Sequence, residues 1–167
     1  MVKLLGVVIL LLVGTIMICS EDAQTKSAPL SQHTASSYFK TPAYSNSSNA
    51  LKAMRLFFCA RKANRRLKWD SCLADRAAKR AKDMVRKNQF SHKDPGTGKN
   101  KAWDLIASCY SYRYGGENLI KGNSSPQEMH DLLMKSPAHR RNILNQRFDR
   151  LGIGCHHDVC VQLFAGF

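Results

Sequence analysis

Acidic residues and long apolar runs are both scarce in this sequence. It has 12 Asp and Glu against 26 Lys and Arg, a formal net charge of +14 at pH 7. No long apolar run follows the first twenty or so residues, so we expect a soluble chain whose length suits one domain. The basic excess favours anionic glycans or lipid head groups as partners, although the solvent faces of basic helices explain most of it.

Several motifs of catalysis and recognition are also missing. The chain has no G-x-S-x-G elbow, no HExxH pair, no CxxC and no glycine-rich phosphate loop after a strand. Ser136 stands three residues before His139, but a hydroxyl at a helix start is better explained as a cap than as a nucleophile. No nucleic-acid module is recognisable. A serine hydrolase and a nucleic-acid-binding protein are therefore disfavoured.

The N-terminal segment is typical of exported proteins. A short positive start precedes an apolar stretch of about fifteen residues, which predicts a cleavable signal over 1–20 with cleavage near Ser20 or Ala23. A signal anchor that stays in the membrane is the alternative. Residues 21–50 lack apolar periodicity and predict a flexible polar leader, and 51–167 form the domain.

Export places the cysteines in an oxidising compartment, where disulfides persist. Five cysteines follow the signal, so one or more is expected to be free or paired between chains. Two β-like runs flank a four-residue loop, which predicts a hairpin closed by Cys155 and Cys160. A Cys59–Cys72 bond would join the first two helices and leave Cys109 as the odd thiol.

Helical spacing begins at Leu51, where the apolar residues Leu51, Met54, Phe57 and Phe58 are predicted to share one face. A second helix is expected after a cap at Asp70 or Ser71. Its predicted buried residues are Leu73, Ala77, Ala81, Met84 and Val85, and its alanines would allow close packing. The stretch "KAWDLIAS" predicts a short helix with Trp103 and Ile106 inward.

The middle of the domain alternates between strand and helix signals. "SYRYGGENLI" predicts a strand interrupted at Gly115-Gly116. Ser125-Pro126-Gln127-Glu128 is a capping box, and the helix that it opens should end near Lys135. Ser136-Pro137 then opens a short helix with His139 in its first turn. Glycosylation triplets begin at Asn46 and Asn123 and matter only in a eukaryotic secretory pathway.

Three residues at element boundaries are the candidates for a metal or catalytic site. A histidine in a first helical turn, such as His139, is favoured in its neutral form, which is the form that ligates metals. With His92 and Glu117 it would supply two nitrogens and a carboxylate, a ligand set used by catalytic zinc. The alternative is that each residue caps or satisfies a loop.

The remaining histidines are less promising. His33 lies in the leader, and His130 is mid-helix and needs only an exposed side. His156 and His157 form a loop pair that indicates a polar turn first and a surface metal site second.

Four segments together resemble the CAP superfamily of cysteine-rich secretory, antigen 5 and pathogenesis-related 1 proteins, also called SCP domains. These are "LKWDSCLADRAAKRAKDM", "NQFSHKDPGTG", "GGENLIKG" with "SPQEMHDLLMKSPAHRRNIL", and "FDRLGIGC" with "VCVQLFAGF". They follow the family's order over nearly all of 51–167. The resemblance implies an α+β fold, a three-layer α-β-α sandwich with a solvent-facing cleft.

The resemblance also implies a tetrad of two histidines and two acidic residues in that cleft, sometimes holding zinc or another divalent ion. His92, His139 and Glu117 match it, whereas Ser136 stands where the second glutamate is usual. Asp131 and Glu128 are less favoured helpers. The family's Asn-x-x-Arg motif is not obvious in the first helix, and its channel-regulatory module is absent from this chain.

Three functions follow from these observations as hypotheses. The leading one is a secreted, monomeric binding or effector module for sterol, fatty-acyl lipid or anionic surfaces, with a role in defence or host contact, that needs no cofactor. The second is a divalent-metal hydrolase or protease that uses His92, Glu117 and His139. The third is a matrix or cell-wall protein held by its basic face.

Overall fold

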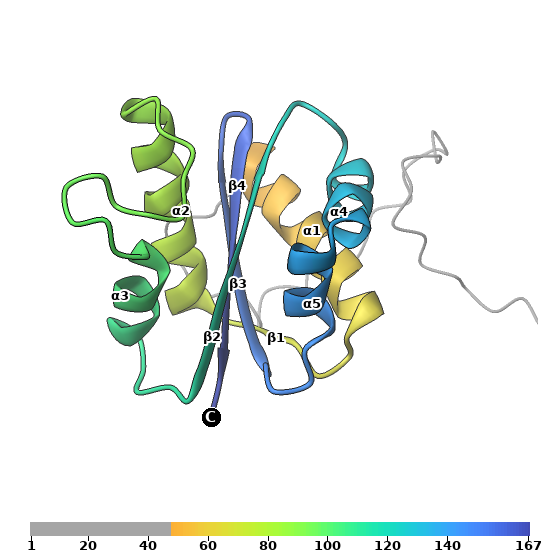
Figure 1. The fold of residues 1–167 in the computed structure, drawn as a ribbon. Coiled ribbons are helices and arrows are strands. Elements are labelled where there is room, and N and C mark those ends of the chain that lie inside the picture. Colours follow the sequence, from red (N-terminus) through yellow and green to blue (C-terminus); the bar gives the residue numbers. More distant parts are fainter. Residues whose placement is uncertain (1–47) are drawn as a thin grey trace, which may run out of the picture.

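A computed structural model of the protein describes residues 48–167. Two helix layers enclose one four-stranded sheet, with α2 and α3 on one face and α1, α4 and α5 on the other (Figure 1). The helices are α1 (Ser48–Ala63), α2 (Ser71–Arg86), α3 (Lys101–Ala107), α4 (Pro126–Lys135) and α5 (Pro137–Leu144). The strands are β1 (Lys68–Trp69), β2 (Tyr114–Lys121), β3 (Arg150–His156) and β4 (Val159–Gly166). The predicted three-layer α+β sandwich is confirmed.

The sheet has the strand order β1-β3-β4-β2, which leaves β2 at an edge. β2, β4 and β3 pair antiparallel, whereas the short β1, which the sequence did not predict, runs parallel to β3. The predicted interruption at Gly115-Gly116 is wrong, because β2 pairs with β4 without a break from Tyr114 to Lys121.

The two glycines of β2 make room for aromatic rings on both faces of the strand. A Cβ at Gly115 would lie 2.8 Å from the Tyr112 ring and 3.0 Å from the Trp103 ring, and one at Gly116 would lie 2.9 Å from the Phe148 ring. Contacts this short are closer than packed carbon atoms allow. Close packing, not a bend of the strand, therefore explains this pair of glycines.

Glycine also sets the distance between α2 and β3. A Cβ at Gly154 would lie 2.0 Å from the Ala78 backbone nitrogen, and one at Gly152 would lie 2.2 Å from the Ala74 nitrogen. Ala77 and Ala81 are fully buried on the same helix. The alanine-rich helix therefore packs almost backbone to backbone on the sheet, as its composition predicted.

The inward faces of two helices differ from the prediction. On α1, Leu51 and Phe58 are 60% and 56% exposed, and the buried residues are Ala50, Ala53, Leu56, Phe57, Cys59 and Ala60. α1 contacts β3, α4 and α5, and these neighbours determine its buried face. On α3, Ile106 is buried as predicted but Trp103 is 42% exposed. The first helix begins at Ser48, inside the predicted leader.

Two disulfides lie within the described residues. Cys155–Cys160 closes the β3–β4 hairpin as predicted, whereas Cys72 pairs with Cys109. The predicted Cys59–Cys72 bond and the odd thiol at Cys109 are therefore wrong. Cys59 lies on α1, across the sheet from α2, and its Sγ is 3.7 Å from Gln127 Oε1 of α4. No cysteine within 48–167 is free.

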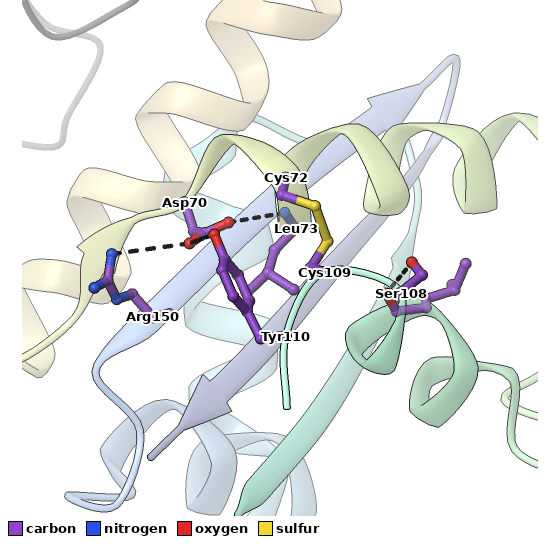
Figure 2. Close-up of a disulfide and its surroundings, with 8 residues drawn as sticks. Asp70, Cys72, Leu73, Ser108, Cys109, Tyr110 and Arg150 are labelled. Carbon is purple, nitrogen blue, oxygen red and sulfur yellow. Dashed lines mark hydrogen bonds and ion pairs between the residues drawn. A yellow bond between two sulfur atoms is a disulfide. The ribbon is translucent and has the colours of Figure 1, made fainter. Parts of the chain in front are cut away.

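The Cys72–Cys109 bond adjoins the cap of α2 (Figure 2). The buried Asp70 carboxylate accepts a hydrogen bond from the Leu73 backbone at 2.9 Å and another from the Tyr110 hydroxyl at 2.9 Å, with Arg150 Nη1 at 3.9 Å. Burial, reinforced by the hydrogen bond to Asp70, raises the pKa of Tyr110. The predicted cap thus also anchors the segment that follows α3.

Other sequence predictions concern the ends of the domain and its surface. The signal, the leader up to residue 47 and Asn46 lie outside the described residues. Asn123 is exposed between β2 and α4, and its glycosylation stays a prediction. Within 48–167, no helix has the length and apolar character needed to cross a bilayer.

Candidate functional site

The candidate site is built on β2, the edge strand. Side chains alternate between the two faces of a strand, so the neighbours Glu117 and Asn118 point to opposite helix layers. Glu117 is 6% exposed and faces Arg80 of α2, whereas Asn118 is fully buried and faces α5. Both helix layers can therefore place a residue beside this short stretch of strand.

The Glu117 carboxylate has a cationic or hydrogen-bonding partner at each oxygen. His92 Nδ1 lies 2.7 Å from Oε2, and Arg80 Nε lies 3.7 Å from Oε1. Arg80 also donates to the backbone oxygens of Ser91 at 2.6 Å and His92 at 3.3 Å. Neither Nε nor Oε1 forms a hydrogen bond, so Arg80 contributes only its charge to the carboxylate, whereas it binds the loop that carries His92 directly.

Sequence reasoning missed Arg80 because it placed the basic residues of this helix in solvent. Arg80 lies three residues after Ala77 and four before Met84, both of which are buried. Residues at these spacings share a helix face. A cation on an otherwise apolar stripe was the signal that could have identified it.

An amide network, also missed, fixes α5 against β2. Asn118 Nδ2 donates to the His139 backbone oxygen at 3.2 Å and to Gln162 Oε1 at 3.0 Å. Asn142 Nδ2 donates to Asn118 Oδ1 at 2.8 Å and to the Glu117 backbone oxygen at 3.1 Å. These bonds position the first turn of α5, and with it His139.

His139 lies close enough to His92 for their charges to interact. Burial lowers the pKa of His139, and the charge of His92 lowers it further. A lowered pKa favours the neutral ring that the sequence predicted, with burial as its first cause. We call His92, Glu117 and His139 together the His–Glu site.

Ser136 departs from the prediction, whereas the helper roles of Glu128 and Asp131 stay untested. Ser136 ends α4 and begins α5, but its hydroxyl makes no capping hydrogen bond, and its backbone oxygen accepts from Arg140 at 2.9 Å. The predicted hydroxyl cap is therefore wrong. Glu128 accepts from the Ser125 backbone at 2.9 Å, and Asp131 accepts from Gln127 at 2.8 Å. Both carboxylates are thus engaged within the α4 segment.

A metal ion held by all three residues of the His–Glu site does not fit this geometry. Glu117 Oε2 is hydrogen-bonded to His92, and its other oxygen faces the Arg80 guanidinium, which would repel a divalent cation. Within 48–167, no group of three or more His, Cys, Asp or Glu side chains is placed to hold a metal. We therefore derive no chemistry from a bound metal.

The other described histidines lie outside this site. His156 and His157 form an edge-to-face pair at the β3–β4 turn, with ring centroids 4.5 Å apart. His130 was predicted to need only an exposed side, which is wrong: it is 7% exposed, and its Nδ1 is buried without a hydrogen bond.

Exposed aromatic rings accompany the His–Glu site. Gly115 and Glu117 share a face of β2 because they are two positions apart along the strand. The Trp103 ring packs against Gly115 and is 42% exposed. Phe90, two residues before His92, is 45% exposed. Exposed apolar surface thus lies on the same face of β2 as Glu117, at Trp103, and two positions before His92 in the chain, at Phe90.

Comparison with known proteins places this geometry in a family. Residues 48–164 match the model of the Cysteine-rich secretory protein family (CAP). The uncharacterized protein YkwD of Bacillus subtilis (strain 168) is 38% identical over 89 residues, which are 53% of this chain and 34% of YkwD. The match thus spans about a third of that relative's length.

Solved structures have the same fold. An extracellular protein containing an SCP domain from Bacillus anthracis str. Ames has a TM-score of 0.64 and 27% identity, over 71% of this chain and 41% of its own. An outer surface protein from Borrelia burgdorferi has a TM-score of 0.57 and 18% identity, over 70% and 90% of the two chains. A cysteine-rich secretory protein from Staphylococcus aureus subsp. aureus Mu50 has a TM-score of 0.58 and 21% identity, over 72% and 40%. With the family match over more than half of its length, the chain belongs to the CAP family of cysteine-rich secretory proteins.

Proposed function

We propose that the protein is a secreted binding module and that the His–Glu site is where its ligand binds. The chain carries disulfides, which persist in oxidising compartments. Among the similar structures, one protein is described as extracellular and another as an outer surface protein. These observations support export.

The observation that carries the binding role is the hydrogen bond between His92 and Glu117. The Glu117 side chain is only 1% exposed, and both of its oxygens face partners, so its role is to orient His92 rather than to meet a ligand. The His92 side chain is 45% exposed, and because Nδ1 faces Glu117, Nε2 is left for a ligand. His139, whose pKa is lowered by burial and by the charge of His92, adds a second imidazole.

A ligand with an apolar body and one polar end suits this arrangement. Trp103 and Phe90 offer exposed rings, and the two imidazoles offer hydrogen bonds to a hydroxyl or a carboxylate. Binding pockets commonly combine apolar surface with a few fixed polar groups. A sterol or a fatty acid has this chemistry.

The test is binding of a sterol and of palmitate to the purified, disulfide-formed protein, measured by native mass spectrometry. We expect His92→Ala/His139→Ala and Trp103→Ala to weaken binding roughly tenfold, the size of one or two lost contacts. His157→Ala, in the exposed β3–β4 turn, is the matched control and should bind as wild type does. The proposal would be refuted if the wild type bound neither lipid, or if the control variant lost as much lipid affinity as the site variants.

A hydrolase is the second candidate, because the contact between His92 and Glu117 has the geometry of a base held by an orienting carboxylate. Ester and peptide hydrolysis by wild type and by His92→Ala tests it. Zinc measured by mass spectrometry in wild type and in His92→Ala/His139→Ala separates a metal-dependent version. Equal, negligible zinc in both proteins would remove that version.

A further inference from the structure

A pocket lies on the α2–α3 side of the protein, between these helices and the loop that joins them. α2 and α3 stand beside one another on this face of the sheet in Figure 1. The pocket is lined by four cations, namely Lys79, Arg80, Lys87 and Lys101. The other lining residues are Asp83, Asp94, Met84, Gln89, Pro95 and Leu105.

Cations outnumber carboxylates in the lining of this pocket, four against two. Asp94 Oδ1 accepts from the Gly96 backbone at 3.0 Å, inside its own loop, and Asp83 Oδ1 pairs with Arg86 at 3.1 Å. Within residues 48–167, neither Lys79 nor Lys87 forms an ion pair, and both are exposed. The pocket therefore has an excess of positive charge that is available to a ligand.

The shape of the pocket selects among anionic partners. Its charges surround a hollow with the apolar residues Met84, Pro95 and Leu105, rather than covering a flat face. An anionic substituent that projects from a single sugar can enter a hollow, whereas the plane of lipid head groups meets only the rim. The apolar residues offer contact to the face of a sugar ring.

Arg80 lines this pocket and also contacts Glu117 of the His–Glu site. It lines the pocket, yet its Nε lies 3.7 Å from Glu117 and its Nη2 donates to the Ser91 and His92 backbone oxygens. An anion that attracts the guanidinium would compete with Glu117 for it. A ligand in the pocket would therefore change the contacts of Arg80 and, through them, the surroundings of His92.

We propose that the α2–α3 pocket binds a sulfate or carboxylate group of an acidic glycan and that Arg80 links its occupancy to the His–Glu site. This site is separate from the proposed lipid site, and each proposal can fail without the other. The pocket lysines Lys79 and Lys87 make the charged contacts, and the apolar residues contact the ring that carries the anionic group.

The test is calorimetric titration of the full, disulfide-formed chain with a sulfated heparin disaccharide. We expect Lys79→Gln/Lys87→Gln to weaken binding roughly tenfold, because two direct charge contacts are lost. Lys62→Gln/Arg65→Gln removes the same net charge from exposed residues outside the pocket and should change affinity less than about twofold. In wild type, the disaccharide should shift the NMR signals of the His92 ring.

Three results would overturn the glycan site. Equal weakening in both double variants would show that only net charge attracts the ligand. If inorganic sulfate bound as tightly as the disaccharide at matched ionic strength, no sugar would be recognised. If phosphatidylglycerol vesicles bound more tightly than the disaccharide through the same lysines, the ligand would be a lipid surface instead. Disaccharide binding that leaves the His92 signals unchanged would refute the link through Arg80.

Discussion

His92 Nδ1 lies 2.7 Å from Glu117 Oε2, although the two residues are 25 positions apart in the chain. Glu117 is fixed by the edge strand, and His92 is fixed by a loop whose backbone Arg80 holds. Because the carboxylate occupies Nδ1, the ring can turn only Nε2 toward a ligand. Residues that do not contact the ligand, Glu117 and Arg80, thus determine which nitrogen of His92 faces it.

Replacement of His92 should change the titration of His139. The charge of His92 is one of the two causes that lower the pKa of His139, and burial is the larger one. In His92→Gln the charge is gone, so the pKa of His139 should rise but stay below its ordinary value, because burial remains. NMR titration of the His139 ring measures this. An unchanged or lower pKa in the variant would show that the rings do not interact.

Substitutions of Arg80 and Glu117 should have non-additive effects on the free energy of unfolding, because the two side chains form an ion pair. The side chains are 11% and 1% exposed, and removal of one partner from a buried pair leaves an uncompensated charge. We expect Arg80→Met and Glu117→Gln each to lower the free energy of unfolding by about 2–4 kcal/mol. The double variant should lose at least about 1 kcal/mol less than the sum.

Chemical denaturation of the four proteins measures this cycle. Arg86→Met is the matched control on the same helix, because its pair with Asp83 is 70% and 50% exposed. Such surface pairs contribute less than about 1 kcal/mol. Strict additivity of the Arg80 and Glu117 variants would contradict a direct interaction.

The sequence predicted well what depends on local chemistry. The capping box at Ser125 and Glu128, the Asp70 cap and the β3–β4 hairpin with Cys155–Cys160 all involve residues close together in the chain. The resemblance to the CAP family supplied the fold and the pairing of His92 with Glu117, which periodicity alone does not give.

The sequence could not predict the features that depend on which face of the sheet each helix covers. The partner of Cys72 follows from α2 and α3 sharing one face while α1 lies on the other. The same placement decides that Phe58 is exposed and His130 is buried. Apolar spacing shows that a helix has a buried side, but not which neighbours cover it.

Buried His130 should make the protein less stable in mild acid. Burial lowers its pKa below the ordinary value of about 6.5, and the charge of Asp131 opposes this only in part. Below about pH 6.5 the unfolded chain takes up a proton at this residue more readily than the folded protein does, so stability falls as the pH falls.

The variant His130→Gln tests this, because the pH dependence of its free energy of unfolding can be compared with that of wild type. Its free energy of unfolding should decline less than that of wild type between pH 7 and pH 5, whatever its stability at pH 7, because the linked proton is gone. Urea denaturation at several pH values gives both curves. Parallel curves would show that His130 does not contribute to the acid sensitivity.

The two disulfides should contribute unequally to stability. Cys72 and Cys109 are 37 residues apart, and Cys155 and Cys160 are 5 apart. The entropy that a crosslink removes from the unfolded chain grows with loop length, giving roughly 4 kcal/mol for the long loop and about 2 kcal/mol for the short one. Denaturation of Cys72→Ser/Cys109→Ser and Cys155→Ser/Cys160→Ser compares them. A larger loss from the hairpin pair would mean that loop entropy does not dominate.

Gly154→Ala should disrupt the packing of α2 on β3. The added Cβ would lie 2.0 Å from the Ala78 nitrogen and 2.4 Å from its Cα, both backbone atoms that cannot rotate away. The helix must then move off the sheet, so we expect a loss of more than about 3 kcal/mol, at the upper end for overpacking. Gly96→Ala is the control, because its nearest contact, Asp94 Oδ1 at 3.4 Å, is ordinary. Circular dichroism during thermal unfolding distinguishes the two, and a Gly154→Ala protein as stable as the control would disprove the close approach of α2 to the sheet.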